Sequence, residues 1–135
     1  MKLIRIPILV LAILALAAVS APAQIVINPT TVECIASADH NTMFEGQPVL
    51  TTYRLELFLQ GGTTPAKVID LGKPTPGTGG LITIVNPAYF VMAVDGAYTG
   101  QIVAVGPGGE GRSEMSNIFL SIHHAPGSPG KPAYR

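Results

Sequence analysis

Val49-Leu-Thr-Thr-Tyr-Arg-Leu-Glu-Leu-Phe-Leu-Gln60 is the stretch that decides the fold class of this chain. Its odd-numbered positions run from Val49 to Leu59 and are apolar or threonine, and they alternate with a set that contains Arg54 and Glu56. Alternation with a period of two predicts a β-strand that is buried on one face. A shift of one residue would bury both Arg54 and Glu56, so the register of this strand is strongly specified.

Shorter stretches with the same period lie on both sides, and no window has a sustained helical stripe. We predict further strands over residues 25–28, 32–38, 67–71, 81–85, 98–105 and 116–122. Clusters rich in glycine and proline separate them, and residues 87–94 are expected to form one short helical turn. About seven short strands, with turn signals every 8–12 residues or so, are typical of an immunoglobulin-like antiparallel β-sandwich.

One stretch resembles a known family. Tyr98-Thr-Gly-Gln-Ile-Val-Ala-Val105, followed by the glycine-rich residues 106–111 and Ser113, is similar to the sixth strand and following loop of a fibronectin type III domain. Residues 46–57 resemble the third strand of that family and its approach. The resemblance covers roughly residues 29–122, and residues 36–41, 70–76 and 105–111 also resemble exported bacterial domains of this type.

The resemblance implies a structural role for two residues. Met92 stands six residues before Tyr98, where the family usually has a leucine. Together they resemble the family's tyrosine corner, in which the phenol bonds a nearby backbone group and pins the connection between the sheets.

The chain departs from the family in one respect, because it has no tryptophan. Fibronectin type III domains usually bury a tryptophan on the second strand, where Cys34 and Ala36 stand here. The core is therefore expected to be filled by other apolar side chains, namely Leu55, Leu57, Ile84, Ile102 and Leu120.

The first 23 residues have the features of an export signal. Lys2 and Arg5 precede an apolar run over residues 8–19, and Ala21-Pro-Ala23 offers the small residues that a signal peptidase reads. We predict cleavage before Gln24 and a secreted or periplasmic protein. The alternative is an uncleaved membrane anchor, but the apolar run is shorter than the ~20 residues that span a bilayer.

The remaining chain is expected to form one domain over residues 24–122, followed by a disordered tail over residues 123–135 that is rich in proline and glycine. Without Lys2 and Arg5 it has six basic and eight acidic residues, a net charge of 6 − 8 = −2. There is no basic run. Nucleic acid and, after signal removal, membranes are therefore not expected as partners.

The inventory of reactive residues argues against catalysis. Ser37, Asp39 and His40 lie too close along the chain to form a nucleophile relay, so we expect Asp39 and Asn41 to cap a loop instead. Asp39, Asn41 and Glu45 lack the regular spacing of a calcium loop. We predict no enzyme, no metal and no cofactor.

The single cysteine, Cys34, cannot form an internal disulfide, and its thiol is expected to be buried as a small apolar group. An intermolecular disulfide or a reactive thiol is the alternative. Residues 106–111 lack the Lys-Ser/Thr of a phosphate loop, so they are expected to form a tight hairpin.

Binding is the function that remains. In the fibronectin type III family the loop between strands two and three and the loop between strands six and seven lie at one pole; here they are residues 39–48 and 106–114. The candidate binding residues are His40, Phe44, Glu110 and Arg112, because an aromatic anchor beside an arginine is favoured at binding hot spots. In the competing interpretation Phe44 plugs the end of the core and Arg112 is merely solvated.

We therefore expect an exported, non-catalytic binding or adhesion module for an unknown protein or glycan, as a monomer or with weak self-association. The alternative is a structural subunit of an extracellular assembly, which pairs with a neighbour through residues 25–28 or an exposed sheet edge.

Overall fold

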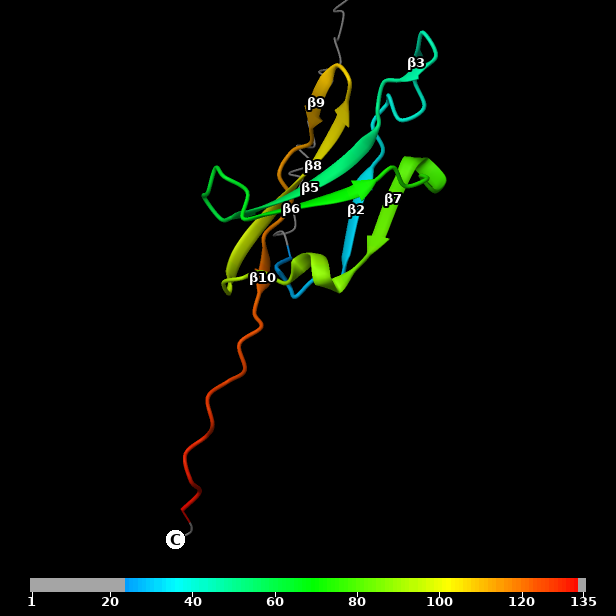
Figure 1. The fold of residues 1–135 in the computed structure, drawn as a ribbon. Coiled ribbons are helices and arrows are strands. Elements are labelled where there is room, and N and C mark those ends of the chain that lie inside the picture. Colours follow the sequence, from blue (N-terminus) through cyan, green and yellow to red (C-terminus); the bar gives the residue numbers. More distant parts are fainter. Residues whose placement is uncertain (1–23, 134–135) are drawn as a thin grey trace, which may run out of the picture.

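The computed structural model describes residues 24–133, in which short β-strands form a sandwich-like arrangement of two sheets (Figure 1). The larger sheet has the strand order β1-β10-β8-β5-β6, and β9 pairs with the upper part of β8. Its strands are β1 (Val26–Ile27), β5 (Thr52–Leu59), β6 (Lys67–Gly72), β8 (Gly96–Gly106), β9 (Gly109–Arg112) and β10 (Phe119–Ser121). All its pairs are antiparallel except β1 with β10, which run parallel.

The smaller sheet consists of β2 (Thr31–Ile35) and β7 (Leu81–Val85), which pair antiparallel. A separate hairpin, β3 (Met43–Phe44) with β4 (Gln47–Pro48), follows β2 and projects beyond the sheets (Figure 1). Two short 3₁₀ turns, Thr78–Gly80 and Pro87–Phe90, flank β7. The second turn begins where the Asn86 side chain accepts the Ala88 amide hydrogen, within the range where a helical turn was predicted.

The prediction of an all-β fold is confirmed. The strand predicted over residues 81–85 has the bounds of β7, and the other predicted strands are present with shifted ends. The tight hairpin expected over residues 106–111 is present, because the end of β8 pairs with β9, although β9 itself was not among the predicted strands. The prediction was wrong over residues 39–48, which were expected to form only a loop and contain β3 and β4.

The core lies between the sheets in two adjoining clusters. The first combines Leu55 and Leu57 of β5 with aromatic residues, and Val32 of the smaller sheet packs against it. The second joins Tyr53 to Ile82 of the smaller sheet. These aromatic side chains, Tyr53, Phe90, Tyr98 and Phe119, fill the space of a core without tryptophan.

The predicted core set is partly correct. Leu55 and Leu57 are buried, and Ile84 and Ile102 are half-buried against the clusters. Leu120 was wrongly placed at the centre, since it is only half-buried. Its neighbours Phe119 and Ser121 are the inward residues of β10, because Phe119 pairs in register with Tyr98 and stacks on its ring.

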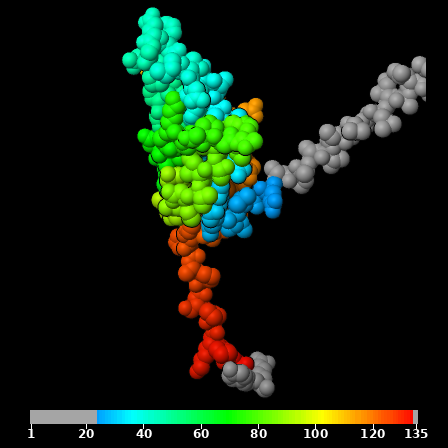
Figure 2. Space-filling model, turned by 90° about the vertical axis from the view of Figure 1, so that its right-hand side faces the viewer, coloured from blue at the N-terminus to red at the C-terminus, as the bar shows by residue number. Residues whose placement is uncertain are grey.

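The two ends of the sandwich differ. The β3–β4 hairpin extends from one pole, and residues 122–133, which form no helix or strand, leave from the other (Figures 1 and 2). The predicted signal, residues 1–23, lies outside the described residues. Within residues 24–133 no helix is long and apolar enough to cross a membrane.

Candidate functional site

A groove of about 480 Å³ opens at the pole that carries the two hairpins. One wall comes from the β3–β4 hairpin and the chain after it, and the other comes from the end of β8 and the turn into β9. The apolar lining residues are Phe44, Pro48, Val49, Leu50, Ala104, Val105 and Pro107. The two loops that were expected to share a pole therefore line one groove.

The two walls are held together by the backbone. Both the amide and the hydroxyl of Thr51 donate to the Val105 carbonyl, at 2.8 and 3.0 Å. At Gly106 the chains approach so closely that a Cβ atom there would lie 1.9 Å from the Val49 carbonyl oxygen. Glycine at this position is therefore required by the close approach of the two chains.

Phe44 and Met43 stand free at the rim, with 69% and 59% of their surface exposed. Their hairpin turns through Glu45 and Gly46, which both have positive φ angles (47° and 78°). Positive φ at both central residues is the requirement of a two-residue type I′ turn. Glu45-Gly46 between Met43-Phe44 and Gln47-Pro48 was the sequence signal for this hairpin, and the prediction missed it. Phe44 does not plug the end of the core.

His40, the first predicted binding residue, is buried, with 8% of its surface exposed. Its Nδ1 atom lies 2.9 Å from the Tyr53 hydroxyl, and the two rings are stacked with centroids 5.7 Å apart. The same hydroxyl oxygen accepts the Ser37 amide hydrogen at 3.0 Å. Burial raises the pKa of Tyr53 above its usual value. His40 thus closes the end of the core, in contrast to the surface position expected for it.

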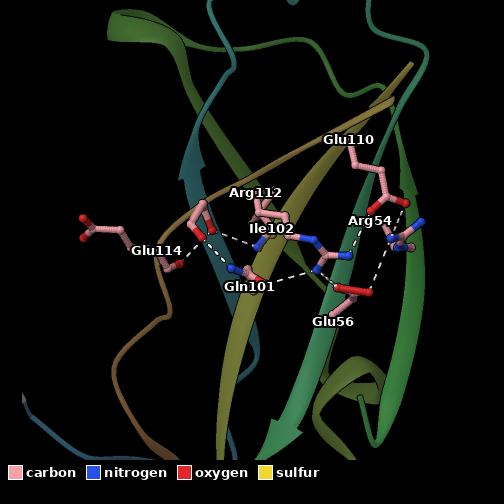
Figure 3. Close-up of polar contacts among 8 residues, drawn as sticks. Arg54, Glu56, Gln101, Ile102, Glu110, Arg112 and Glu114 are labelled. Atoms are coloured by element: carbon pink, nitrogen blue, oxygen red, sulfur yellow. Dashed lines mark hydrogen bonds and ion pairs between the residues drawn. The ribbon is translucent and has the colours of Figure 1, made fainter. Parts of the chain in front are cut away.

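Arg112 and Glu110 lie on the outer face of the larger sheet, in a network with Arg54 and Glu56 (Figure 3). Arg112 contacts Glu56 at 2.5 Å and Glu110 at 2.9 Å, and Arg54 contacts Glu110 at 2.8 Å. The hydrogen bond from Arg54 is the main reason why the pKa of Glu110 is lowered. The pKa of Arg112 is raised, and the main cause is its hydrogen bond to Glu56. Arg112 is therefore neither a free anchor nor merely solvated.

This network also covers apolar surface. Val103 of β8 stands in register between Arg54 of β5 and Arg112 of β9, and it has no exposed surface. Arginine stems can bury an apolar neighbour while their guanidinium groups stay in water. Of the four predicted binding residues, Phe44 and Glu110 line the pole groove, whereas His40 and Arg112 do not.

The predicted corner residues lie in the core. The Tyr98 hydroxyl donates to the Val94 carbonyl at 2.5 Å, and 3% of the residue is exposed. Met92 is buried, and its amide donates to the Ser121 hydroxyl, which in turn donates to the Phe90 carbonyl. These bonds tie the segment before β8 to β10.

A second groove, of about 400 Å³, runs beside β2 and was not predicted. Its floor includes Val32, Leu55, Leu57, Ile102 and Phe119, and its charged lining residues are Glu33 and Glu114. At the two ends of the β2–β7 ladder, the Ala36 amide donates to the Gly80 carbonyl and the Asn86 amide donates to the Thr30 carbonyl. By the alternation of antiparallel pairs, the backbone groups of residues 31, 33 and 35 face away from β7. Within residues 24–133 no strand pairs with that edge.

Chemically reactive groups are dispersed. Among the described residues, no three His, Cys, Asp or Glu side chains gather into a possible metal site. His124 pairs with Asp95 at 2.9 Å on the surface. Cys34 is half-buried, and burial raises the pKa of its thiol, which disfavours the nucleophilic thiolate.

Comparison with protein-family models, with curated proteins and with solved structures finds no match to this chain.

Proposed function

We propose that the chain is an exported, non-catalytic binding module of the fibronectin type III type, which recognises a protein or glycan at the hairpin pole. The single observation that carries this proposal is Phe44, an aromatic side chain with 69% of its surface exposed beside an apolar groove of about 480 Å³. Aromatic side chains, phenylalanine included, are enriched in interfaces, and a few anchor residues carry most of the binding energy there.

The surroundings of Phe44 favour binding over catalysis. The groove is lined by aliphatic side chains, prolines and a glycine-rich turn, with Asp39 and Glu110 as its charged residues. The turn into β9 supplies backbone groups close to the groove, which suits hydrogen bonding to a partner. The sheet order, the Tyr98–Val94 bond and the shared pole of the two hairpins support the proposed family.

The test compares Phe44→Ala with Val68→Ala, a matched removal of an exposed apolar side chain on β6. Labelled mature protein is applied to a glycan array and to intact cells of the producing organism. We expect Phe44→Ala to lose attachment with an unchanged melting temperature, and Val68→Ala to keep both. A Phe44→Ala protein that melts several degrees lower and still attaches would exclude the pole as the binding site.

Edge pairing is a second candidate function, favoured by the edge of β2 that no strand within residues 24–133 pairs with, beside its apolar groove. Such an edge can accept a strand from a neighbouring molecule. Glu33→Pro removes an outward amide from this edge, and Thr83→Pro removes the equivalent amide from the far edge of β7. Self-association that is abolished by Glu33→Pro and kept by Thr83→Pro would support this candidate. Unchanged sedimentation of both variants would exclude it.

A further inference from the structure

The tail of the chain carries a regular proline pattern. Pro126, Pro129 and Pro132 are spaced by three residues. A polyproline II helix has three residues per turn, so in that conformation the three prolines lie along one face. Residues 125–133 are exposed and make no hydrogen bond with the rest of the described chain. The proline face of the tail is thus available to a binding groove.

The pole groove has the properties that such a ligand needs. Proline-rich segments of the form P-x-x-P dock in grooves lined by aromatic side chains. Here the lining has one aromatic side chain, Phe44, and Pro48 and Pro107 add flat apolar surface. Each proline fixes its own φ angle near the polyproline II value, which reduces the conformational entropy that the tail loses on binding.

Charge favours the same pairing. Asp39 lines the groove and Glu45 is exposed in the adjacent turn, whereas the other lining carboxylate, Glu110, is already paired with Arg54 and Arg112. Residues 125–135 contain Lys131 and Arg135 and no acidic residue. Opposite charges on two surfaces steer their encounter and fix the orientation in which they bind.

The arrangement in space indicates which copy's groove the tail reaches. The tail leaves the sandwich at the pole opposite the β3–β4 hairpin and points away from it (Figures 1 and 2). We infer that residues 126–132 of one molecule bind the pole groove of a second copy, so that molecules join head to tail. This inference rests on the proposed function, because it uses the same groove and names one partner. A head-to-tail contact that does not close into a ring produces an open chain.

The test uses two complementary variants of the mature chain, residues 24–135. Phe44→Ala damages the groove and leaves the tail intact. The combined change of Pro126, Pro129 and Pro132 to alanine damages the tail and leaves the groove intact. Sedimentation velocity over a series of concentrations should show self-association of the unmodified chain and of the Val68→Ala control. Each damaged variant should associate about tenfold more weakly, as expected for loss of an anchor residue.

Mixing the two variants gives the decisive measurement. The intact tail of the Phe44→Ala chain should bind the intact groove of the chain whose three tail prolines are alanine, which restores a one-to-one complex. Lys131→Glu is a further tail variant, and it should weaken association more at low salt than at high salt.

An unmodified chain that stays monomeric at every concentration would overturn the inference, and so would a mixture that associates no better than its components. The proposed function is tested separately, by the attachment of the Phe44→Ala protein to glycans and cells. Loss of that attachment in a monomeric protein would leave the proposed function in place and remove the tail as its partner.

Discussion

Tyr53 and His40 form a stacked, hydrogen-bonded pair, with the tyrosine hydroxyl 2.9 Å from Nδ1 of the histidine. The pair joins β5 to the loop that carries the β3–β4 hairpin. The same hydroxyl accepts the Ser37 amide hydrogen, which fixes the start of that loop. The exposed Phe44 is therefore displayed on a segment whose base is fixed in the core.

The change Tyr53→Phe should destabilise the protein. It removes one hydroxyl and leaves both the Ser37 amide and the His40 ring without that partner. Leaving a buried polar group unpaired costs about 1–3 kcal/mol, so the free energy of unfolding should fall by about that amount. Urea denaturation of both proteins measures the difference, and coincident curves would contradict the assigned bonds.

Tyr98→Phe should have a smaller effect. The Tyr98 hydroxyl donates to one carbonyl, that of Val94, and a typical intramolecular hydrogen bond contributes about 1 kcal/mol. The ring still stacks on Phe119 in the variant, so packing should be unchanged. The same denaturation experiment checks this value, and a variant as stable as the unmodified protein would argue against the tyrosine corner.

Gly106→Ala should be among the most damaging small substitutions in the chain. Its Cβ atom would lie 1.9 Å from the Val49 carbonyl oxygen, so the backbone of one wall of the groove must move. Overpacking of this kind costs about 2 kcal/mol or more. Gly108→Ala is the matched control, since a Cβ atom there meets nothing within 4 Å. Equal melting temperatures of the two variants would show that the walls do not meet as described.

Acid should weaken the outer-face network. The pKa of Glu110 is lowered in the folded protein, chiefly by the hydrogen bond from Arg54. A lowered pKa means that the contribution of Glu110 to stability is fully present above its ordinary pKa of 4.5 and is lost as the pH falls through the lowered folded value. Glu110→Gln should therefore be less stable than the unmodified protein at neutral pH, and the difference should shrink in acid. A difference that stays constant from neutral pH to about pH 2 would contradict the ion pairing.

The export signal predicts the first residue of the exported protein. The protein recovered from the periplasm or the medium should begin at Gln24, because Ala21-Pro22-Ala23 directly precedes it. Intact-mass measurement gives the answer. Material that still contains residues 1–23 would favour the uncleaved membrane anchor.

The alternation of apolar and polar residues predicted the β-strands because burial on one face leaves a period-two pattern. Strand β7 kept the predicted bounds, and Leu55 and Leu57 of β5 point inward as predicted. The prediction that β5 is buried on one face only was wrong, because Glu56 and Phe58 are also buried. In β10 the pattern was misleading. Phe119 and Ser121 are the inward residues, and Ser121 is tolerated there because its hydroxyl is hydrogen-bonded.

The candidate site was harder to predict because its residues are defined by contacts between distant segments. His40 and Arg112 are polar residues next to turns, which is the pattern of a surface loop. Their partners, Tyr53 for His40 and Glu56 for Arg112, are distant in sequence, and only the packed sheets bring them together. Phe44 differs because it lies in a two-residue strand of a separate hairpin, which no other sheet of the described residues covers.

The parallel pairing of β1 with β10 has a mechanical consequence. The Asn28 amide donates to the Leu120 carbonyl, and the Asn28 side chain forms two hydrogen bonds with the backbone of Ile122. The Asn117 side chain donates to the Gln24 carbonyl. These bonds link the first and last strands side by side. Tension applied between the beginning of β1 and the end of β10 pulls two parallel neighbours along their length in opposite directions. Their hydrogen bonds are then loaded together in shear and do not open one after another. Tension between the chain that precedes β1 and the chain that follows β10 would thus pass through a pair of strands whose hydrogen bonds resist it together.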